Sequence, residues 1–290
     1  MRKRSVGASI TAFLAMLAMV LGALVAQPTT AGAQSSPFAK GPNPTATSVT
    51  QNGTFATTTA TVPASVAGFG GGTITYPTST TSGTFGAIAF APGFTATNAS
   101  YTWVGPRIAS HGFVVFAINT DSRFDNPSSR ATQLQNALNY LVNNSVAASR
   151  IDRNRLAVSG HSMGGGGTLI AADRNAAIQA AVALQPWNSS STNFSGVDVP
   201  SLIVGAQNDT IAAVNQHSIP FYNSIPAASE KALVVVAGQS HGLGTTLNTI
   251  QARSMLVWLK RYVDDDTRYE AFICPLVTSG ASDYRNTCPG

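Results

Sequence analysis

The sequence predicts an α/β domain in which a mainly parallel sheet is covered by helices on both faces. Short apolar runs typical of buried strands alternate along the chain with longer amphipathic segments typical of helices. One expected strand runs directly into a glycine-flanked serine at the start of a helix. The chain has 290 residues and neither an internal repeat nor a second zone of composition. It is therefore long enough to bury one such core as a single domain.

The expected strands are short and apolar, except for the first two, which are dense in threonine. They cover residues 55–62, 73–76, 85–91, 113–118, 156–159, 180–184, 201–206 and 232–237. Helices are expected over residues 101–110, 130–146, 163–173 and 246–263. In the second helix Leu134, Leu138, Leu141 and Val142 recur at the spacing of one helical face. Residues 34–52 are rich in Pro, Ser, Gly and Thr and indicate an extended arm.

The first 33 residues are interpreted as a secretory signal peptide. Arg2, Lys3 and Arg4 precede an apolar run over residues 10–26, and Ala-Gly-Ala at 31–33 is a small-residue cleavage site. The alternative is an uncleaved membrane anchor, because the apolar run is nearly long enough to span a bilayer. The domain assignment is therefore a leader over 1–33 and a single domain over 34–290. We expect an extracellular protein with no membrane attachment after cleavage.

Charge and cysteine content narrow the possible functions. The leader holds three of the 17 basic residues, which leaves 14 against 12 acidic ones and a formal net charge of +2. After the leader, the sequence has no cluster of Lys and Arg, so no nucleic-acid partner is expected. Cys274 and Cys288 are expected to form a disulfide, because an even cysteine count in an exported chain favours pairing. No histidine lies near them in the sequence, which argues against zinc.

The segment Gly160-His161-Ser162-Met163-Gly164 matches the G-x-S-x-G pattern of a nucleophile elbow. The pattern alone is weak, because glycine and serine are common residues. Here it follows the strand expected at 156–159 and begins a helix, and three further glycines let that helix pack closely on the sheet. We therefore predict an α/β-hydrolase fold with Ser162 as its nucleophile. The alternative is a glycine-rich turn with an ordinary serine.

Strand ends and chain order select the general base and its acid partner. In the α/β-hydrolase fold the serine is followed along the chain by the acid and then by the histidine. Asp209 follows the strand at 201–206 and His241 follows the strand at 232–237. Both are thus expected at the carboxyl edge of the sheet, where α/β folds carry their sites. The other histidines and aspartates are expected elsewhere. His111 and Asp198 are expected at the opposite edge, His161 in the elbow, and His217 and Asp173 in helices. Asp264, Asp265 and Asp266 come after His241 and are expected at a solvated helix end.

Two backbone N–H groups are expected to form an oxyanion hole. Met163 follows the nucleophile, and Phe94 lies in the loop after the strand at 85–91. Trp187 follows the strand at 180–184 and is expected to form a flat apolar wall for the substrate beside the serine. The alternative for Trp187 is a packed residue at the rim, whereas Trp103 and Trp258 are expected in the core.

The chain from residue 42 to residue 289 resembles the actinomycete cutinases, lipases and polyester (PET) hydrolases. The stretches that carry the resemblance are Gly41-Pro42-Asn43-Pro44-Thr45, Pro92-Gly93-Phe94-Thr95, Ile108-Ala109-Ser110-His111-Gly112-Phe113-Val114-Val115, Gly160-His161-Ser162-Met163-Gly164-Gly165-Gly166-Gly167, Pro186-Trp187, Asn208-Asp209-Thr210-Ile211-Ala212, Trp258-Leu259-Lys260-Arg261 and Asp266-Thr267-Arg268-Tyr269. The resemblance implies the following roles: a triad of Ser162, Asp209 and His241, oxyanion donors Phe94 and Met163, a substrate-stacking Trp187 and a Cys274–Cys288 disulfide.

The chain departs from the family pattern around the cleft. Phe94 stands where members usually carry Tyr, so a hydroxyl is lost while the backbone donor remains. Some heat-stable members bind calcium through acidic residues, and two of those positions correspond to Gln207 and Ala237 here. We therefore expect no metal and no other cofactor. The second disulfide of the PET-specialised branch is absent, because its positions correspond to Ala206 and Leu243. The loop after the predicted base is shorter than usual.

The favoured hypothesis is a secreted cutinase-like serine esterase that cleaves polyesters such as cutin, suberin or PET, and short to medium acyl esters, through an acyl-enzyme. A triacylglycerol lipase or general carboxylesterase with incidental polyester activity is the near alternative. A peptidase or amidase would use the same triad, and an inactive hydrolase could serve as a binding module. No insertion between the triad residues is long enough for a lid domain. The expected partner is thus an ester or polyester surface, and the protein is expected to be a monomer.

Overall fold

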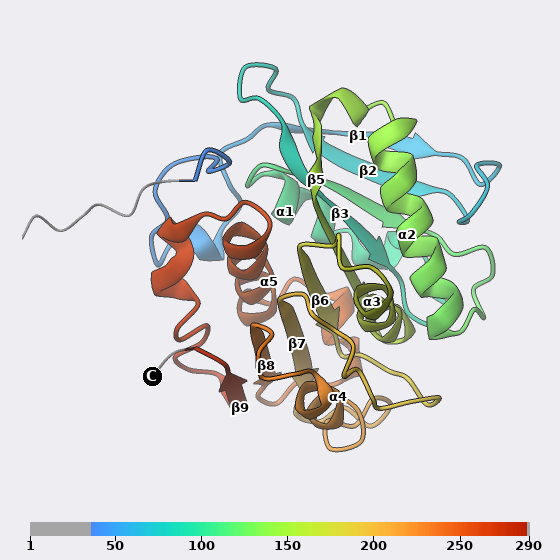
Figure 1. Ribbon diagram of the computed structural model, residues 1–290, viewed down its shortest axis with the longest axis vertical. Helices are drawn as coiled ribbons and strands as arrows, with labels where there is room; N and C mark the ends of the chain where they lie inside the picture. The colour runs from blue at the N-terminus through green and yellow to red at the C-terminus, as the bar shows by residue number, and fades with distance from the viewer. Residues whose placement is uncertain (1–35, 289–290) are drawn as a thin grey trace, which may run out of the picture. The chain divides into compact units, whose positions relative to one another are not determined.

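The computed structural model describes residues 36–288, and within them nine strands form one sheet (Figure 1). The expected leader over 1–33 lies outside the described residues. The strands are β1 (Thr57–Val62), β2 (Gly72–Pro77), β3 (Phe85–Ala91), β4 (Phe113–Ile118), β5 (Ile151–His161), β6 (Ala180–Leu184), β7 (Ser201–Ala206), β8 (Lys231–Val236) and β9 (Ala281–Asn286). Their order across the sheet is β1-β2-β4-β3-β5-β6-β7-β8-β9.

The central part of the sheet is parallel, as predicted. Strands β4, β3, β5, β6, β7 and β8 pair in parallel, and β1, β2 and β9 add antiparallel pairs at the two edges. The loops that leave the parallel strands at their carboxyl ends therefore meet at one edge of the sheet. All described elements belong to one compact unit.

Helices cover both faces of the sheet (Figure 1). They are α1 (Val104–Ala109), α2 (Pro127–Asn143), α3 (Met163–Arg174), α4 (Ser218–Ser224) and α5 (Thr249–Tyr262). Side chains of α2, α3 and α4 share one hydrophobic core, and those of α1 and α5 share a second. Strand β3 supplies both cores by alternation, since Ala87 and Ala89 belong to the first and Ile88 and Phe90 to the second. The predicted fold class is confirmed.

Two elements differ from the sequence prediction. Residues 101–110 do not form one helix, because a 3-10 helix η2 (Asn98–Tyr101) precedes the short α1. Strand β9 was not expected, and it pairs antiparallel with β8. Its residues are mostly polar and half-buried, so the apolar pattern that marks the other strands is missing. A strand at the edge of a sheet packs less of its surface, which explains why its sequence carries no such pattern.

Two of the three aspartates after α5 are buried, so the prediction of a solvated helix end is wrong for them. Asp264 pairs with Arg155 at 2.8 Å and with Lys260 at 2.5 Å. Asp266 pairs with Arg268 at 2.7 Å. A buried carboxylate is costly unless cationic partners compensate for the lost water. The Asp264–Arg155 pair joins the end of α5 to β5, and of the three aspartates Asp265 alone is exposed.

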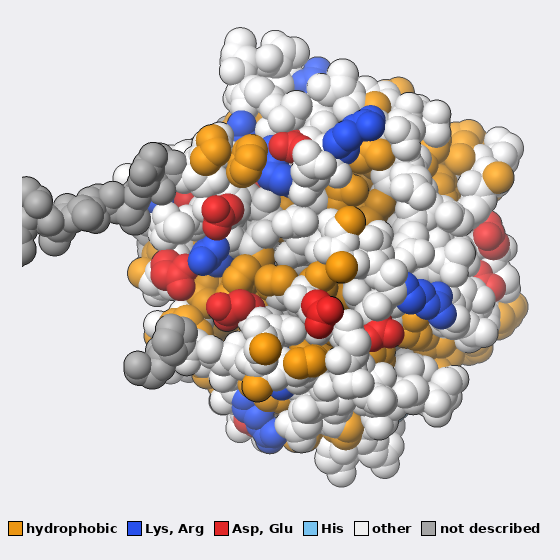
Figure 2. All heavy atoms as spheres, in the orientation of Figure 1, with side chains coloured by type: hydrophobic (Ala, Val, Ile, Leu, Met, Phe, Trp, Pro, Cys, Tyr) orange, Lys and Arg blue, Asp and Glu red, His pale blue; other side chains and the backbone are white. Residues whose placement is uncertain are grey.

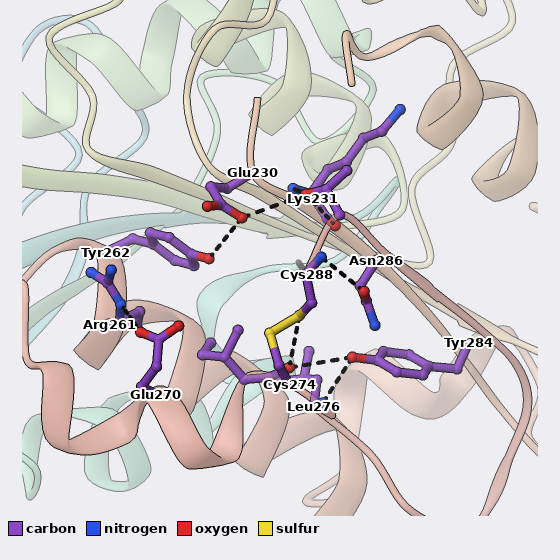
Figure 3. The surroundings of a disulfide bond; sticks show 12 residues. Glu230, Lys231, Arg261, Tyr262, Glu270, Cys274, Leu276, Tyr284, Asn286 and Cys288 are labelled. Carbon is purple, nitrogen blue, oxygen red and sulfur yellow. Dashed lines mark hydrogen bonds and ion pairs between the residues drawn. A yellow bond between two sulfur atoms is a disulfide. The ribbon is translucent and has the colours of Figure 1, made fainter. Parts of the chain in front are cut away.

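A disulfide joins Cys274 and Cys288, as predicted (Figure 3). It connects the segment after α5 to the end of β9. Next to it, the Tyr284 hydroxyl accepts from the Leu276 N–H at 2.8 Å and donates to the Ile273 carbonyl at 3.3 Å. The bridge and these hydrogen bonds together hold the edge strand and its preceding loop in one place.

Removal of this disulfide should lower stability and leave catalysis at room temperature unchanged. The bridge closes a loop of about 15 residues, for which chain entropy predicts about 3 kcal/mol of stabilisation. Thermal unfolding of the wild type and of a Cys274→Ser/Cys288→Ser variant, each with and without reductant, measures this. Reductant should lower the melting temperature of the wild type only. Two free thiols in the exported wild-type protein would contradict the pairing.

Candidate active site

Five loops at the carboxyl edge of the sheet carry the predicted site residues. Phe94 follows β3, Ser162 follows β5, Trp187 follows β6, Asp209 follows β7 and His241 follows β8. These strands are parallel, and β3, β5, β6, β7 and β8 are consecutive neighbours in the sheet. The topology therefore brings residues that are widely separated in the sequence to one edge.

The turn at Ser162 has the strained geometry of a nucleophile elbow. Ser162 has φ 56° and ψ −119°, a region that residues other than glycine rarely adopt. A Cβ on Gly160 would lie 2.5 Å from the Gly164 carbonyl oxygen, so the turn requires glycine there. The Ser162 N–H donates to the Leu184 carbonyl, and the Ser162 carbonyl accepts from the Trp187 N–H, both at 2.9 Å. The strained peptide is thus anchored to β6 and its loop.

Ser162, His241 and Asp209 form a continuous hydrogen-bonded chain. His241 Nε2 lies 2.8 Å from Ser162 Oγ, and His241 Nδ1 lies 2.7 Å from Asp209 Oδ2. A carboxylate only accepts, so the proton of the neutral imidazole is on Nδ1. Nε2 is left with a lone pair toward the serine hydroxyl. This arrangement can take a proton from Ser162 when its oxygen attacks a substrate.

Asp209 is held ionised by its hydrogen bonds. Its side chain is fully buried, and burial alone would raise the pKa of the carboxyl group. The bond from His241 and the N–H groups of Ala212 (2.8 Å) and Ile211 (2.9 Å) outweigh burial, so the pKa lies below the ordinary value for Asp. The carboxylate is therefore charged at neutral pH and can stabilise a positive charge on His241.

The backbone N–H groups of Phe94 and Met163 are available to a ligand. Within the described part of the chain neither donates a hydrogen bond to protein. Met163 is the first residue of α3, where N–H groups have no partner inside the helix. The loop of Phe94 approaches the elbow closely, since a Cβ on Gly93 would lie 3.1 Å from the Ser162 Cβ. Two free donors beside the serine are what a developing oxyanion requires.

Trp187 lies at the rim of the site and is neither fully buried nor fully exposed. Its ring centroid is 6.0 Å from that of His217, which precedes α4 and in turn contacts Phe221 edge-on at 5.5 Å. The indole is thus supported from one side by a buried imidazole. From the sequence, His217 is expected inside a helix and without a connection to Trp187. No local pattern signals this contact, because the two residues come from different loops.

Exposed apolar side chains surround the same edge. Phe94 is 49% exposed and packs edge-on against Phe124, which is 71% exposed, with ring centroids 5.6 Å apart. Ile211 and Leu247, on the loops that follow β7 and β8, are 61% and 62% exposed. We call Phe94, Phe124, Ile211 and Leu247 the apolar rim. Of these, only Phe94 is predicted from the sequence. Large apolar residues in otherwise polar loops are the sequence signal that marks the other three.

The remaining candidates from the sequence have other surroundings. His111 is buried against Arg107, and His161 is buried beside the triad. Trp103 and Trp258 are buried, as predicted. In the described residues no three His, Cys, Asp or Glu side chains are grouped closely enough to hold a metal ion. The Gln207 side chain, at one of the calcium-associated positions, accepts from the Gly238 N–H at 2.8 Å.

The parallel sheet, the strained elbow and the contacts among Ser162, His241 and Asp209 define a serine hydrolase with the α/β-hydrolase fold. Residues 32–289 match the family described as PET hydrolase-like. The chain belongs to this family, and the resemblance stated from the sequence is confirmed.

Characterised relatives cover most of the chain. A bis(hydroxyethyl) terephthalate hydrolase from Streptomyces coelicolor is 47% identical over 288 residues, which are 97% of this chain and 91% of the relative. Cutinase 1 from Thermobifida cellulosilytica is 48% identical over 263 residues, 88% of this chain and 99% of the relative. A cutinase from Thermobifida fusca is also 48% identical over 263 residues, 88% of this chain and 86% of the relative.

Proposed function

We propose that this protein is a secreted, cutinase-like ester hydrolase that cleaves polyesters such as cutin, suberin or PET, and short to medium acyl esters. The observation that carries the proposal is the hydrogen-bonded chain from Asp209 through His241 to the Ser162 hydroxyl. The apolar rim around that chain suits the alkyl and aromatic segments of polyesters. Similarity to cutinases and to a bis(hydroxyethyl) terephthalate hydrolase supports the same substrate class.

The reaction follows from the positions of the proposed groups. Ser162 Oγ attacks the ester carbonyl carbon while His241 Nε2 takes the hydroxyl proton. The N–H groups of Phe94 and Met163 stabilise the negative charge on the carbonyl oxygen. The imidazolium then gives its proton to the departing alcohol, which leaves an acyl-enzyme. Water attacks this ester with the same base, so the acid departs and Ser162 is restored. Asp209 keeps the imidazole in the required tautomer throughout.

An open site is the second part of the proposal. Between β6 and β7 the described chain contains no helix, and between β7 and β8 it contains only the seven-residue α4. Neither segment is long enough for a lid domain, so a solid polymer can reach the serine directly. The rate on a soluble ester should accordingly show no jump at its solubility limit. A sharp jump would indicate a mobile loop that covers the site.

The surface also bears on possible partners. On the face drawn in Figure 2, basic and acidic side chains occur in small interspersed groups. None of the helices in the described part of the chain has the length and apolar character of a membrane-crossing segment. Export, with cleavage after Ala33 and a monomeric product over 34–290, is part of our proposal. The mass of the protein recovered from the culture medium, together with its molar mass in solution, tests this part.

Replacement of Trp187 by Ala should weaken polymer hydrolysis more than hydrolysis of a small ester. Aromatic stacking at the rim is worth about 1 kcal/mol, so we expect roughly a fivefold loss on polyester film. A short nitrophenyl ester needs less of this wall and should lose much less. The measurements are release of soluble acids from film and release of nitrophenol in solution, with exposed Val146→Ala as the control.

The same assays distinguish the competing functions. Equal losses on both substrates in Trp187→Ala would mean that the indole supports the fold rather than the polymer. Faster turnover of triglycerides than of any polyester would favour a lipase. An absence of turnover on every ester would contradict the proposed function.

A further inference from the structure

A buried chain of hydrogen bonds connects the loops of the active site behind the triad. The N–H of Gly93 donates to the Tyr101 hydroxyl at 2.8 Å, and this hydroxyl lies 2.9 Å from His161 Nδ1. The other ring nitrogen, His161 Nε2, lies 2.9 Å from the carbonyl oxygen of His241. Tyr101 is 2% exposed and His161 is 4% exposed. The triad itself uses neither side chain.

The direction of every bond in this chain follows from the chemistry of its ends. The His241 carbonyl can only accept, so His161 Nε2 carries the ring proton. In the neutral imidazole Nδ1 then accepts, which means that the Tyr101 hydroxyl donates to it. The hydroxyl oxygen is left to accept from the Gly93 N–H, which can only donate. The three bonds are therefore mutually consistent in one arrangement.

Burial keeps this arrangement neutral. It lowers the pKa of His161 to about 3, and the nearby His241 acts in the same direction. Burial also raises the pKa of Tyr101 to about 12, despite the hydrogen bond from Gly93. Neither group gains or loses a proton in the range where a histidine base works. The chain is thus a fixed support and not a route for protons.

The loops on either side pack directly against the His161 ring. A Cβ on Gly244, in the 3-10 helix η4 (His241–Thr245), would collide with that ring. A Cβ on Gly93 would lie 3.2 Å from His161 Nδ1. The indole N–H of Trp103 donates to the Gly244 carbonyl at 3.0 Å, which is a second tether of η4. Tyr101, at the end of η2, thus contacts the loop of Gly93, and Trp103, just after η2, contacts the loop of Gly244.

We propose that Tyr101 and His161 are positioning residues that hold the oxyanion loop, the elbow and the catalytic histidine in mutual register. The proposal rests on the proposed function. Gly93 directly precedes Phe94, and His161 directly precedes Ser162. Neither Tyr101 nor His161 touches the reacting atoms, so each acts through the backbone it holds. Catalytic geometry tolerates only fractions of an ångström, which makes such support significant for rate.

The test removes one oxygen atom. Tyr101→Phe keeps the ring, which packs 4.9 Å from Phe90, and leaves the Gly93 N–H and His161 Nδ1 without their partner. A buried polar group without its partner is unfavourable, so the loops that carry these groups should shift away from the catalytic geometry. We therefore expect kcat on a nitrophenyl ester to fall about tenfold. KM should stay within about twofold, since ground-state binding is not touched.

The matched control is Tyr140→Phe on α2. Its hydroxyl has no hydrogen-bond partner among residues 36–288, and its half-buried ring packs edge-on against Phe69 at 5.5 Å. This variant should keep the wild-type kcat. Titration of the reactive serine in each variant ensures that kcat refers to folded enzyme only. Nitrogen NMR of the histidines supplies a readout independent of activity: His161 should carry its proton on Nε2, and its Nδ1 signal should move to that of an unbonded acceptor in Tyr101→Phe.

Each outcome decides between two readings. A fall in kcat confined to Tyr101→Phe, with KM unchanged and the Nδ1 signal displaced, supports the positioning role. Equal kcat in all three proteins overturns it, and so does an unchanged Nδ1 signal or a loss of equal size in Tyr140→Phe. An inactive wild type would contradict the proposed function itself, and the positioning role with it.

Discussion

Ser162→Ala should abolish ester hydrolysis and leave the fold intact. Loss of a triad nucleophile lowers kcat on the order of a millionfold. The Ser162 Oγ bonds only to His241 Nε2 among the described side chains, so its removal breaks no structural contact. The backbone bonds that anchor the elbow do not involve the hydroxyl. Nitrophenyl ester turnover and thermal unfolding, measured on the same preparation, check both parts of the expectation.

The control for this variant is another serine of the same edge. Ser191 lies exposed in the loop between β6 and β7, and Ser191→Ala should retain full activity. If a clean preparation of Ser162→Ala keeps more than a few per cent of wild-type turnover, Ser162 is not the nucleophile. A loss of the folded state in Ser162→Ala would contradict the claim that the hydroxyl has no structural role.

Asp209→Asn should lower kcat about ten-thousandfold, because the new side chain imposes the wrong tautomer on the base. Asp209 Oδ1 accepts from the N–H groups of Ile211 and Ala212, so an amide must keep its oxygen at that position. Its NH₂ group then faces His241 Nδ1 in place of Oδ2. The imidazole can only accept from it, and the ring proton moves to Nε2. Nε2 then points a proton at the Ser162 hydroxyl and no longer serves as a base.

An exposed aspartate provides the comparison for this variant. Asp198 precedes β7 at the other edge of the sheet, and Asp198→Asn changes the same charge without touching the site. This variant should keep its turnover and its melting temperature. High activity in Asp209→Asn would mean that another group orients His241, and the acid would have to be sought elsewhere.

Local chemistry explains why much of the site was predictable. An elbow needs a strand, a serine and small flanking residues in immediate succession, and Gly160 to Gly164 provide them within five positions. Asp209 and His241 were found by a topological rule, because parallel strands must end at one edge. The other candidates were excluded by their expected place in a helix, in the elbow or at the opposite edge, and Asp264 to Asp266 also by their order along the chain. Their roles in catalysis stay predictions that the variants above test.

Buried partners outside the triad that meet across long sequence distances were not predictable. Tyr101 and His161 are 60 residues apart and Arg155 and Asp264 are 109 apart, yet both pairs are buried and hydrogen-bonded. A local pattern records whether a position favours burial, but not which group will face it. A tyrosine at the end of a short helix therefore looks like any packed aromatic, and an aspartate beside two others looks solvated.

The sequence by itself determined the fold class, the elbow, the placement of Asp209 and His241 at strand ends, and the cysteine pair. These depend on backbone periodicity, on steric limits at glycines and on the order of strands along the chain, all of which can be recognised from short stretches of sequence. Only the tertiary structure decided that β9 closes the sheet edge, that Asp264 is buried in an ion-paired cluster and that His161 is held between Tyr101 and His241. Burying a polar group is favourable only when a partner is supplied, and that partner comes from a distant part of the chain.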